Sequence, residues 1–339
     1  MSNVKIGLVG AGRMGSFHAE TVAYKIPGAE LAAIADPVPG AANKLAERLG
    51  CPKVYTNPEE MFADPDVDAV LIAAPARSHA KLVVAAAKEG KGVFCEKPMA
   101  VTLEEADEAI QAMRQAGVPL QVGFNRRFAA GFKEAHDDIK KGKIGTPQLM
   151  RSLTRDPGLG DPTPIPEWTI FLETLIHDFD TLLYLNPGAE PTDVYAVADA
   201  LVRPDFKDKG LLDTAVVNIR FDNGAIATAE ANFQAVYGYD VRGEVFGSAG
   251  MITAGDVRQT SMVRYTADGA NSDTCRKDTE LLHDAYVAEV TSFVECVRTG
   301  GTPYTTGEDA HRALAIALAC IESVKKNAPV QVKGNTQLI

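Results

Sequence analysis

The N-terminal segment of the chain carries its most constraining feature, a predicted strand that runs through a glycine-rich turn into a predicted helix. Residues 4–9 are an apolar strand pattern, and residues 13–24 have helical spacing. Between and within them, Gly10 permits a tight turn, Gly12 lets the backbone approach a phosphate, and Gly15 lets the helix lie close to the strand. A helix N-terminus also attracts phosphate through its N–H groups and partial positive charge. The segment therefore predicts a parallel α/β sheet that binds a dinucleotide.

Asp36, which ends the next predicted strand, indicates which dinucleotide is bound. Its carboxylate is expected to accept hydrogen bonds from the adenosine ribose. Its charge would repel the extra phosphate of NADP, and residues 37–40 include no Arg to receive that phosphate. We therefore predict NAD as the cofactor, against the alternative of an ordinary strand–turn–helix with a capping Asp. The predicted cofactor contacts are Gly10, Gly12, Arg13, Met14, Gly15, Asp36, Ala74, Glu96 and Lys97.

The periodicity of the sequence changes near residue 123 and predicts two domains. Before that point, short apolar runs alternate with helical patterns, which is typical of a doubly wound parallel Rossmann sheet with helices on both faces. After it, residues 192–265 alternate apolar and polar side chains, which predicts a large, mostly antiparallel open sheet with one covered face. Helical patterns flank this region. We predict an NAD-binding domain over residues 1–123 and an α+β domain for substrate binding and oligomerisation over residues 124–339.

Composition excludes several classes of partner. The 339 residues carry a net charge of −11, and such a surface disfavours nucleic acid and anionic membranes. No apolar run reaches the roughly 18 residues of a membrane span, and the N-terminus lacks a signal-peptide pattern. The five cysteines are scattered and form no C-x-x-C pair, which favours free thiols in a reducing cytoplasm over disulfides or zinc. We therefore expect a cytoplasmic protein with a small-molecule substrate and no bound metal.

Two groups of residues are candidates for catalysis. Lys97 precedes Pro98 and follows a predicted strand, and ligands bind at the carboxyl ends of such strands; the alternative is a solvated loop lysine. Glu173 and His177 lie four residues apart on a predicted helix, so they share one face. A His is suited to accept a proton from an alcohol near neutral pH, and Asp180 is placed to orient it. The alternative for this pair is an exposed ion pair on a helix surface.

Together these motifs resemble a known family. The glycine turn followed by His18, the tripeptide Glu96-Lys97-Pro98, residues 121–127, and a carboxylate four residues before His177 are similar to the glucose–fructose oxidoreductase, inositol dehydrogenase and rhizopine catabolism (Gfo/Idh/MocA) family. The order and spacing hold over nearly the whole chain. Residues 143–147 and 237–240 are similar to those of its inositol dehydrogenases.

The resemblance implies an activity and a set of roles. Lys97 would hold the reacting oxygen and His177 would act as general base, with Glu173 beside it in place of the Asp usual among inositol dehydrogenases. The implied reaction is NAD-dependent oxidation of a cyclic polyol, myo-inositol to its 2-keto product, in a homotetramer. The alternatives are oxidation of scyllo-inositol or an aldose, or a non-catalytic dinucleotide sensor. The implied substrate contacts are Lys97, Arg127, Asp156, Glu173, His177, Tyr237 and Tyr286.

Overall fold

The computed structural model describes residues 3–333, which form two compact units. Unit 1 consists of residues 3–124 together with Tyr286–His311. Unit 2 consists of Asn125–Ala285 together with residues 312–333. The chain thus returns to its N-terminal unit near its end. Within the described residues, no helix has the length and apolar character needed to cross a membrane.

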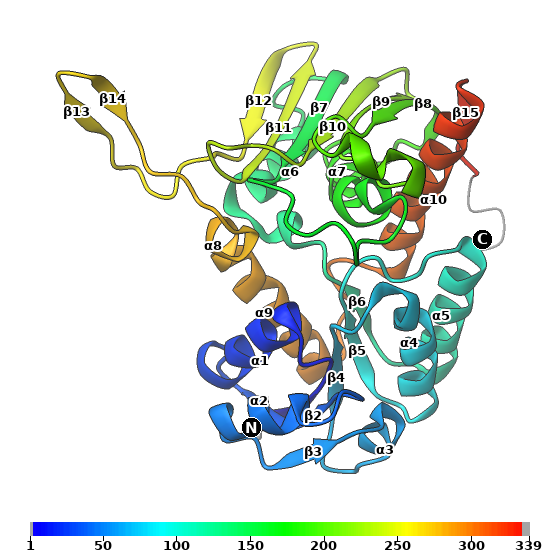
Figure 1. The fold of residues 1–339 in the computed structure, drawn as a ribbon. Coiled ribbons are helices and arrows are strands. Elements are labelled where there is room, and N and C mark those ends of the chain that lie inside the picture. Colours follow the sequence, from blue (N-terminus) through cyan, green and yellow to red (C-terminus); the bar gives the residue numbers. More distant parts are fainter. Residues whose placement is uncertain (1–2, 334–339) are drawn as a thin grey trace. The chain divides into compact units, whose positions relative to one another are not determined.

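Unit 1 is built on a six-stranded parallel sheet with the order β3-β2-β1-β4-β5-β6 (Figure 1). This is the order of a doubly wound dinucleotide-binding sheet, which confirms the predicted fold class. The edge strand β3 escaped prediction because three half-buried residues give no periodic signal. The strands are β1 (Val4–Val9), β2 (Ala29–Ala35), β3 (Lys53–Tyr55), β4 (Ala69–Ile72), β5 (Gly92–Cys95) and β6 (Leu120–Val122).

Helices cover the sheet of unit 1, and one of them comes from the far end of the chain. Val290, Phe293 and Val294 of α9 pack into the same buried cluster as Leu8 of β1 and Phe94 of β5. The sequence prediction had assigned this helix, with everything after residue 123, to the second domain. The helices of unit 1 are α1 (Arg13–Lys25), α2 (Ala41–Leu49), α3 (Pro58–Phe62), η1 (Ala76–Ser78), α4 (His79–Lys88), α5 (Leu103–Ala116) and α9 (His283–Thr299).

Unit 2 is built on a seven-stranded sheet with the order β12-β11-β7-β10-β9-β8-β15 (Figure 1). The predicted mostly antiparallel sheet is confirmed, although β7 and β10 at its centre run parallel. The strands are β7 (Pro147–Arg155), β8 (Pro191–Asp199), β9 (Thr214–Phe221), β10 (Ile226–Asn232), β11 (Asp240–Gly247), β12 (Gly250–Ala254) and β15 (Val330–Gln331). A separate exposed ribbon consists of β13 (Arg264–Thr266) and β14 (Gly269–Asn271).

Helices cover one face of this sheet and leave the other open. Strand β9 shows the division, because Val217 and Ile219 are buried whereas Val216 and Arg220 are exposed. Helix α7 packs on β7 and β10. The helices are η2 (Asn125–Phe128), α6 (Ala130–Lys140), the π-helical turn η3 (Ile170–Thr174), α7 (Leu175–Tyr184), η4 (Pro204–Lys209), α8 (Asp278–Leu281) and α10 (Gly307–Lys326).

Candidate active site

The glycine turn of unit 1 has the geometry that its sequence predicts. Gly10 has a φ of +95°, and a Cβ there would lie 2.6 Å from the carbonyl oxygen of Ala73. A Cβ on Gly15 would lie 1.8 Å from the carbonyl oxygen of Gly10, so α1 can approach β1 only without a side chain at this position. A Cβ on Gly12 would have no neighbour within 4 Å. The turn is therefore closed where helix meets strand and open at Gly12, where a ligand phosphate would approach.

The start of α1 and the Asp36 carboxylate complete a surface that fits a dinucleotide. Gly12, the N-cap of α1, provides no side-chain cap, and no acidic residue lies in the first turn. The buried Asp36 accepts hydrogen bonds from the N–H groups of Ala11 (2.7 Å) and Val38 (2.8 Å). Because a carboxylate has about four acceptor positions, Asp36 can hold the glycine turn and still accept ribose hydroxyls.

The Glu96-Lys97-Pro98 loop follows β5 and is anchored from below. Glu96 is buried, and its Oε1 lies 2.6 Å from Nε2 of His18 on α1. Its Oε2 accepts the backbone N–H of Lys97 at 3.2 Å. Burial opposes ionisation of this carboxyl, but the hydrogen bond and charge of His18, with Lys97 and His79, outweigh it and lower the pKa of Glu96. The loop that carries Lys97 thus lies over a buried carboxylate.

His79 connects this loop to the one that follows β4, a role that the sequence analysis missed. Its Nδ1 lies 2.8 Å from the carbonyl oxygen of Pro98, and its Nε2 lies 2.7 Å from that of Ala74. The ring is buried at the start of α4. The sequence offered one signal for this role, because His79 is the first residue of a helix that follows a strand of the sheet. The imidazole fixes the spacing of two loops at the carboxyl edge of the sheet, where a nicotinamide binds in such folds.

In unit 2, two buried ion pairs fix the helix that carries His177. Arg127 forms a bidentate pair with Asp180, with nitrogen–oxygen distances of 2.6 to 3.1 Å. Arg126 donates to Asp178 at 2.8 Å. The sequence predicts that Asp180 orients His177 and that Arg127 binds substrate, and both roles stay predictions. In the structure Arg127 pairs with Asp180 and also lies over the Tyr184 ring, 5.0 Å from its centroid. The pairing follows from burial, since a guanidinium removed from water requires a carboxylate.

Asp178 also attaches α7 to strand β7 of the sheet. The hydroxyl groups of Ser152 and Thr154 on β7 donate to its carboxylate at 2.5 and 2.6 Å. Asp178 is fully buried, so these bonds and the pair with Arg126 compensate for its loss of hydration. The preceding residue of the helix is His177, whose carbonyl oxygen accepts a hydrogen bond from Thr181 at 2.7 Å. The imidazole therefore projects from a firmly held turn.

The helix around Glu173 and His177 is less regular than the sequence predicts. Residues 170–174 form the π-helical turn η3, and the α-helix begins at Leu175. The wider π turn means that Glu173 and His177 are not related by ordinary α-helical spacing, which corrects the basis for placing them on one face. Both side chains are half-buried. Single π turns are frequent at functional sites.

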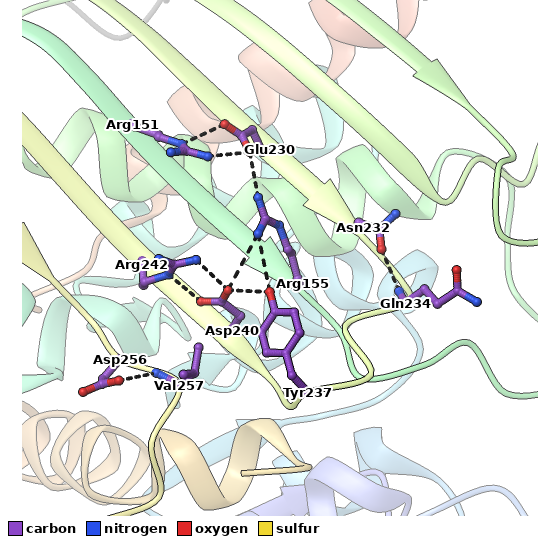
Figure 2. A network of polar contacts seen from close by, with 10 residues as sticks. All are labelled: Arg151, Arg155, Glu230, Asn232, Gln234, Tyr237, Asp240, Arg242, Asp256 and Val257. Carbon is purple, nitrogen blue, oxygen red and sulfur yellow. Dashed lines mark hydrogen bonds and ion pairs between the residues drawn. The ribbon is translucent and has the colours of Figure 1, made fainter. Parts of the chain in front are cut away.

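Two more of the predicted substrate residues lie where β7, β10 and β11 meet. Asp156 follows β7, and burial together with the Asp156 charge raises the pKa of Tyr239 well above its usual value. The Tyr237 hydroxyl donates to Asp240 at 2.7 Å and lies 3.4 Å from Nη1 of Arg155; Figure 2 shows the three side chains together. Arg242 donates two hydrogen bonds to the same Asp240 carboxylate (Figure 2). Tyr237 is thus part of a charged network on the sheet.

The remaining predicted substrate residue, Tyr286, belongs to unit 1. It is buried at the start of α9, and its ring packs edge-on against Phe17 (5.2 Å between centroids) and His18 (5.9 Å). One turn further along α9, Glu289 approaches His18 and Glu96. The ligand atoms of these three buried side chains lie within 4.8 Å of one another, and the expectation of no bound metal stays a prediction. Glu289 lies on the apolar face of α9, and a Glu at such a position in the sequence indicates a buried carboxyl group.

Comparisons with known proteins agree with this geometry. Residues 4–124 match the family described as "Oxidoreductase family, NAD-binding Rossmann fold", and residues 136–332 match its "C-terminal alpha/beta domain". A myo-inositol 2-dehydrogenase of Thermotoga maritima is 38% identical, over 97% of this chain and 99% of the relative. A scyllo-inositol 2-dehydrogenase (NAD(+)) of Bacillus subtilis is 37% identical, over 97% and 96%. The crystal structure of a Lactobacillus casei scyllo-inositol dehydrogenase with NAD(H) and scyllo-inositol has a TM-score of 0.92 at 30% identity, covering 98% of this chain and 99% of that one.

Replacing Asp36 by Asn tests its role in cofactor choice. The amide keeps the size of the side chain and one acceptor for the turn but removes the charge that repels a 2′-phosphate. We expect the preference for NAD over NADP, measured as the ratio of kcat/KM values, to fall at least tenfold, through better use of NADP. The exposed Asp205→Asn variant is the control. Equal use of both cofactors by the unaltered enzyme would contradict the assignment.

Proposed function

Because the chain belongs to the Gfo/Idh/MocA oxidoreductase family, we propose that it oxidises a cyclic polyol with NAD, and that myo-inositol is its preferred substrate. The family is that of NAD-dependent oxidoreductases that act on CH–OH groups. The observation that carries the proposal is the Glu96-Lys97-Pro98 loop, which is anchored by His18 and His79 at the edge of a sheet that fits the cofactor. Relatives that share the whole length of the chain are named for myo- and scyllo-inositol.

The proposed chemistry requires one proton acceptor and one group that holds the reacting oxygen. When bound, the nicotinamide accepts a hydride from the carbon that carries the hydroxyl. His177 takes the hydroxyl proton, and the ammonium of Lys97 stabilises the negative charge that develops on the oxygen. Lys97 belongs to unit 1 and His177 to unit 2, and their action on one substrate is part of the proposal. Glu173 supports the charged form of His177.

The polar character of unit 2 supports a polyol over an apolar alcohol. Asp156 and Tyr239 lie at the carboxyl end of β7, and Asn232 ends the parallel strand β10 at the same edge. Such groups match the alternating donors and acceptors of adjacent hydroxyls. A site of this kind discriminates strongly, since an analogue that lacks one hydroxyl leaves a buried polar group unpaired.

Substitution of the two proposed catalytic residues tests the mechanism. Lys97→Ala and His177→Ala should each lower kcat by about 10²–10⁴-fold, the usual contribution of an acid–base group. Binding of NADH, followed by its fluorescence, should change by less than about tenfold because the glycine turn and Asp36 remain. Lys81→Ala, at a surface position of α4, serves as the control. Near-normal turnover by either variant would remove that residue from the mechanism.

A panel of substrates tests the preference for myo-inositol. We expect kcat/KM with NAD to be highest for myo-inositol, and lower for scyllo-inositol, D-chiro-inositol, glucose and xylose. Glu173→Asp should change the ranking among the inositols, because shortening the side chain by one methylene moves the carboxylate beside His177. A uniform loss in that variant would limit Glu173 to supporting His177. A higher kcat/KM for glucose or xylose than for every inositol would reject the assignment of a cyclitol substrate. A higher kcat/KM for scyllo-inositol than for myo-inositol would reject only the choice of isomer.

We further propose that the enzyme is a cytoplasmic homotetramer that associates through the open face of the unit 2 sheet. Four exposed apolar side chains, Met251, Phe246, Leu149 and Ile226, are register neighbours across β12, β11, β7 and β10. Their exposed fractions are 48% to 55%. A contiguous apolar row on a sheet is typical of an interaction surface. The five free thiols, four of them buried, support a reducing compartment.

Light scattering coupled to size exclusion checks the tetramer. We expect a mass of four chains for the unaltered protein. Phe246→Glu places a charge in the middle of the apolar row and should yield smaller species, whereas Tyr24→Glu, at an exposed position of α1, should not. A monomeric mass for the unaltered protein at micromolar concentration would reject this interface.

A further inference from the structure

Three titratable side chains meet in the interior of unit 1, beneath the Lys97 loop. His18 comes from α1, Glu96 from the end of β5, and Glu289 from α9. Their polar atoms lie within 4.8 Å of one another, and their exposed fractions are 0%, 7% and 0%. Two carboxyl groups and one imidazole are thus confined where water does not compensate their charges.

Glu96 has the partners of an ionised carboxylate. Its Oε1 lies 2.6 Å from His18 Nε2, and its Oε2 accepts the backbone N–H of Lys97. Because a carboxylate only accepts hydrogen bonds, His18 is the donor in the short contact. A charge-assisted bond of this length is strong.

Glu289 has the opposite surroundings. Among the described residues, neither of its carboxyl oxygens has a hydrogen-bond partner. The Gln121 side chain donates to the backbone oxygen of Glu289, not to its carboxyl group. An ionised carboxylate would pay the full cost of burial here and would also repel Glu96. A protonated carboxyl avoids both costs.

We propose that Glu289 is held as a neutral carboxylic acid in the His18–Glu96–Glu289 cluster, which thereby carries one carboxylate charge and positions the Lys97 loop. Burial and the charge of Glu96 raise the pKa of Glu289 well above its usual value, in agreement with this state. The other titratable groups facing the cluster are Lys97 and His79, which interact with Glu96, and Tyr286, whose ring contacts His18. The positioning of Lys97 rests on the proposed function; the protonation of Glu289 does not.

The same three residues could instead be ligands of a metal ion, but their spacing favours a proton. Ligand atoms of a tetrahedral zinc site lie ~2.0–2.1 Å from the ion and hence roughly 3.3 Å from one another. The His18 and Glu96 atoms are 2.6 Å apart, a hydrogen-bond distance. A proton between them accounts for this contact without moving either side chain.

The pH dependence of thermal stability in Glu289→Gln tests the proposal without reference to catalysis. The amide imitates the neutral acid in size and as a donor. Because the folded-state pKa of Glu289 is raised, the unaltered protein should match the variant near pH 4.5, the ordinary value for Glu. As pH rises from there towards the folded-state pKa, the unaltered protein should lose stability relative to the variant. Its equilibrium constant for unfolding should increase about tenfold per pH unit relative to that of the variant. Tm measured from pH 4.5 to 8.5 should therefore show Glu289→Gln gaining on the unaltered protein.

Two controls make this measurement decisive. Glu295→Gln, at an exposed position of the same helix, should show no such gain. If Glu289 is ionised in the folded protein, neither the folded nor the unfolded state holds its proton above pH 4.5, so the Tm difference between Glu289→Gln and the unaltered protein will stay constant as pH rises, which overturns the proposal. A rise in Tm with Zn²⁺ or Mn²⁺ in the unaltered protein, absent in Glu289→Gln and reversed by EDTA, would likewise overturn it in favour of a metal site.

The positioning role is tested at His18. His18→Phe removes the donor to Glu96, so Glu96 should take up a proton more readily and the acidic limb of the kcat/KM profile should move to higher pH. His18→Gln offers an amide N–H to Glu96 and should restore the limb towards its original position. A His18→Phe variant that folds, binds NADH and keeps the original profile would overturn the positioning role. Inactivity of the unaltered protein on every polyol would refute the proposed function and leave the Tm result intact.

Discussion

The close approach of α1 to β1 determines most of what unit 1 can do. A Cβ on Gly15 would lie 1.8 Å from the carbonyl oxygen of Gly10, so the absence of a side chain fixes the distance between helix and strand. This contact directs the helix N-terminus at the phosphate position. It also brings His18, nearly one turn further along α1, within 2.6 Å of Glu96. The cofactor turn and the support of the Lys97 loop therefore depend on the same packing distance.

In unit 2, buried ion pairs hold the helix that carries His177 in place. Arg126 and Arg127 are adjacent in the chain, and Asp178 and Asp180 lie on α7, so two ion pairs bind a short helical turn to the helix that carries His177. Ser152 and Thr154 extend this network into the sheet. Buried pairs of this kind contribute less to stability than apolar packing would, because both ions lose their hydration. Their effect is geometric, since they fix which turn of α7 faces the end of β7.

The glycine turn and the His18–Glu96–Glu289 cluster are two layers of one site in unit 1. The turn, the start of α1 and Asp36 are the groups that we predict to contact the dinucleotide directly. The cluster lies beneath and reaches the site through the backbone N–H of Lys97. His79 adds a second support through Ala74 and Pro98. The loop is thus fixed on both sides by buried imidazoles, and the role proposed for the Lys97 ammonium depends on this support.

The sequence by itself determined the features that depend on neighbours along the chain. Thr102 caps α5 with a 3.2 Å bond from the Glu105 N–H, Gly117 ends it at a φ of +68°, and the glycine turn has its predicted form, because each contact spans only a few residues. Tertiary structure alone decided that Glu289 joins His18 and Glu96, since Glu96 and Glu289 lie 193 positions apart in the sequence and helix periodicity gives no partner for a buried carboxyl. It likewise decided that Arg127 meets Asp180. Burial selects such pairs, and burial is fixed only when distant segments pack.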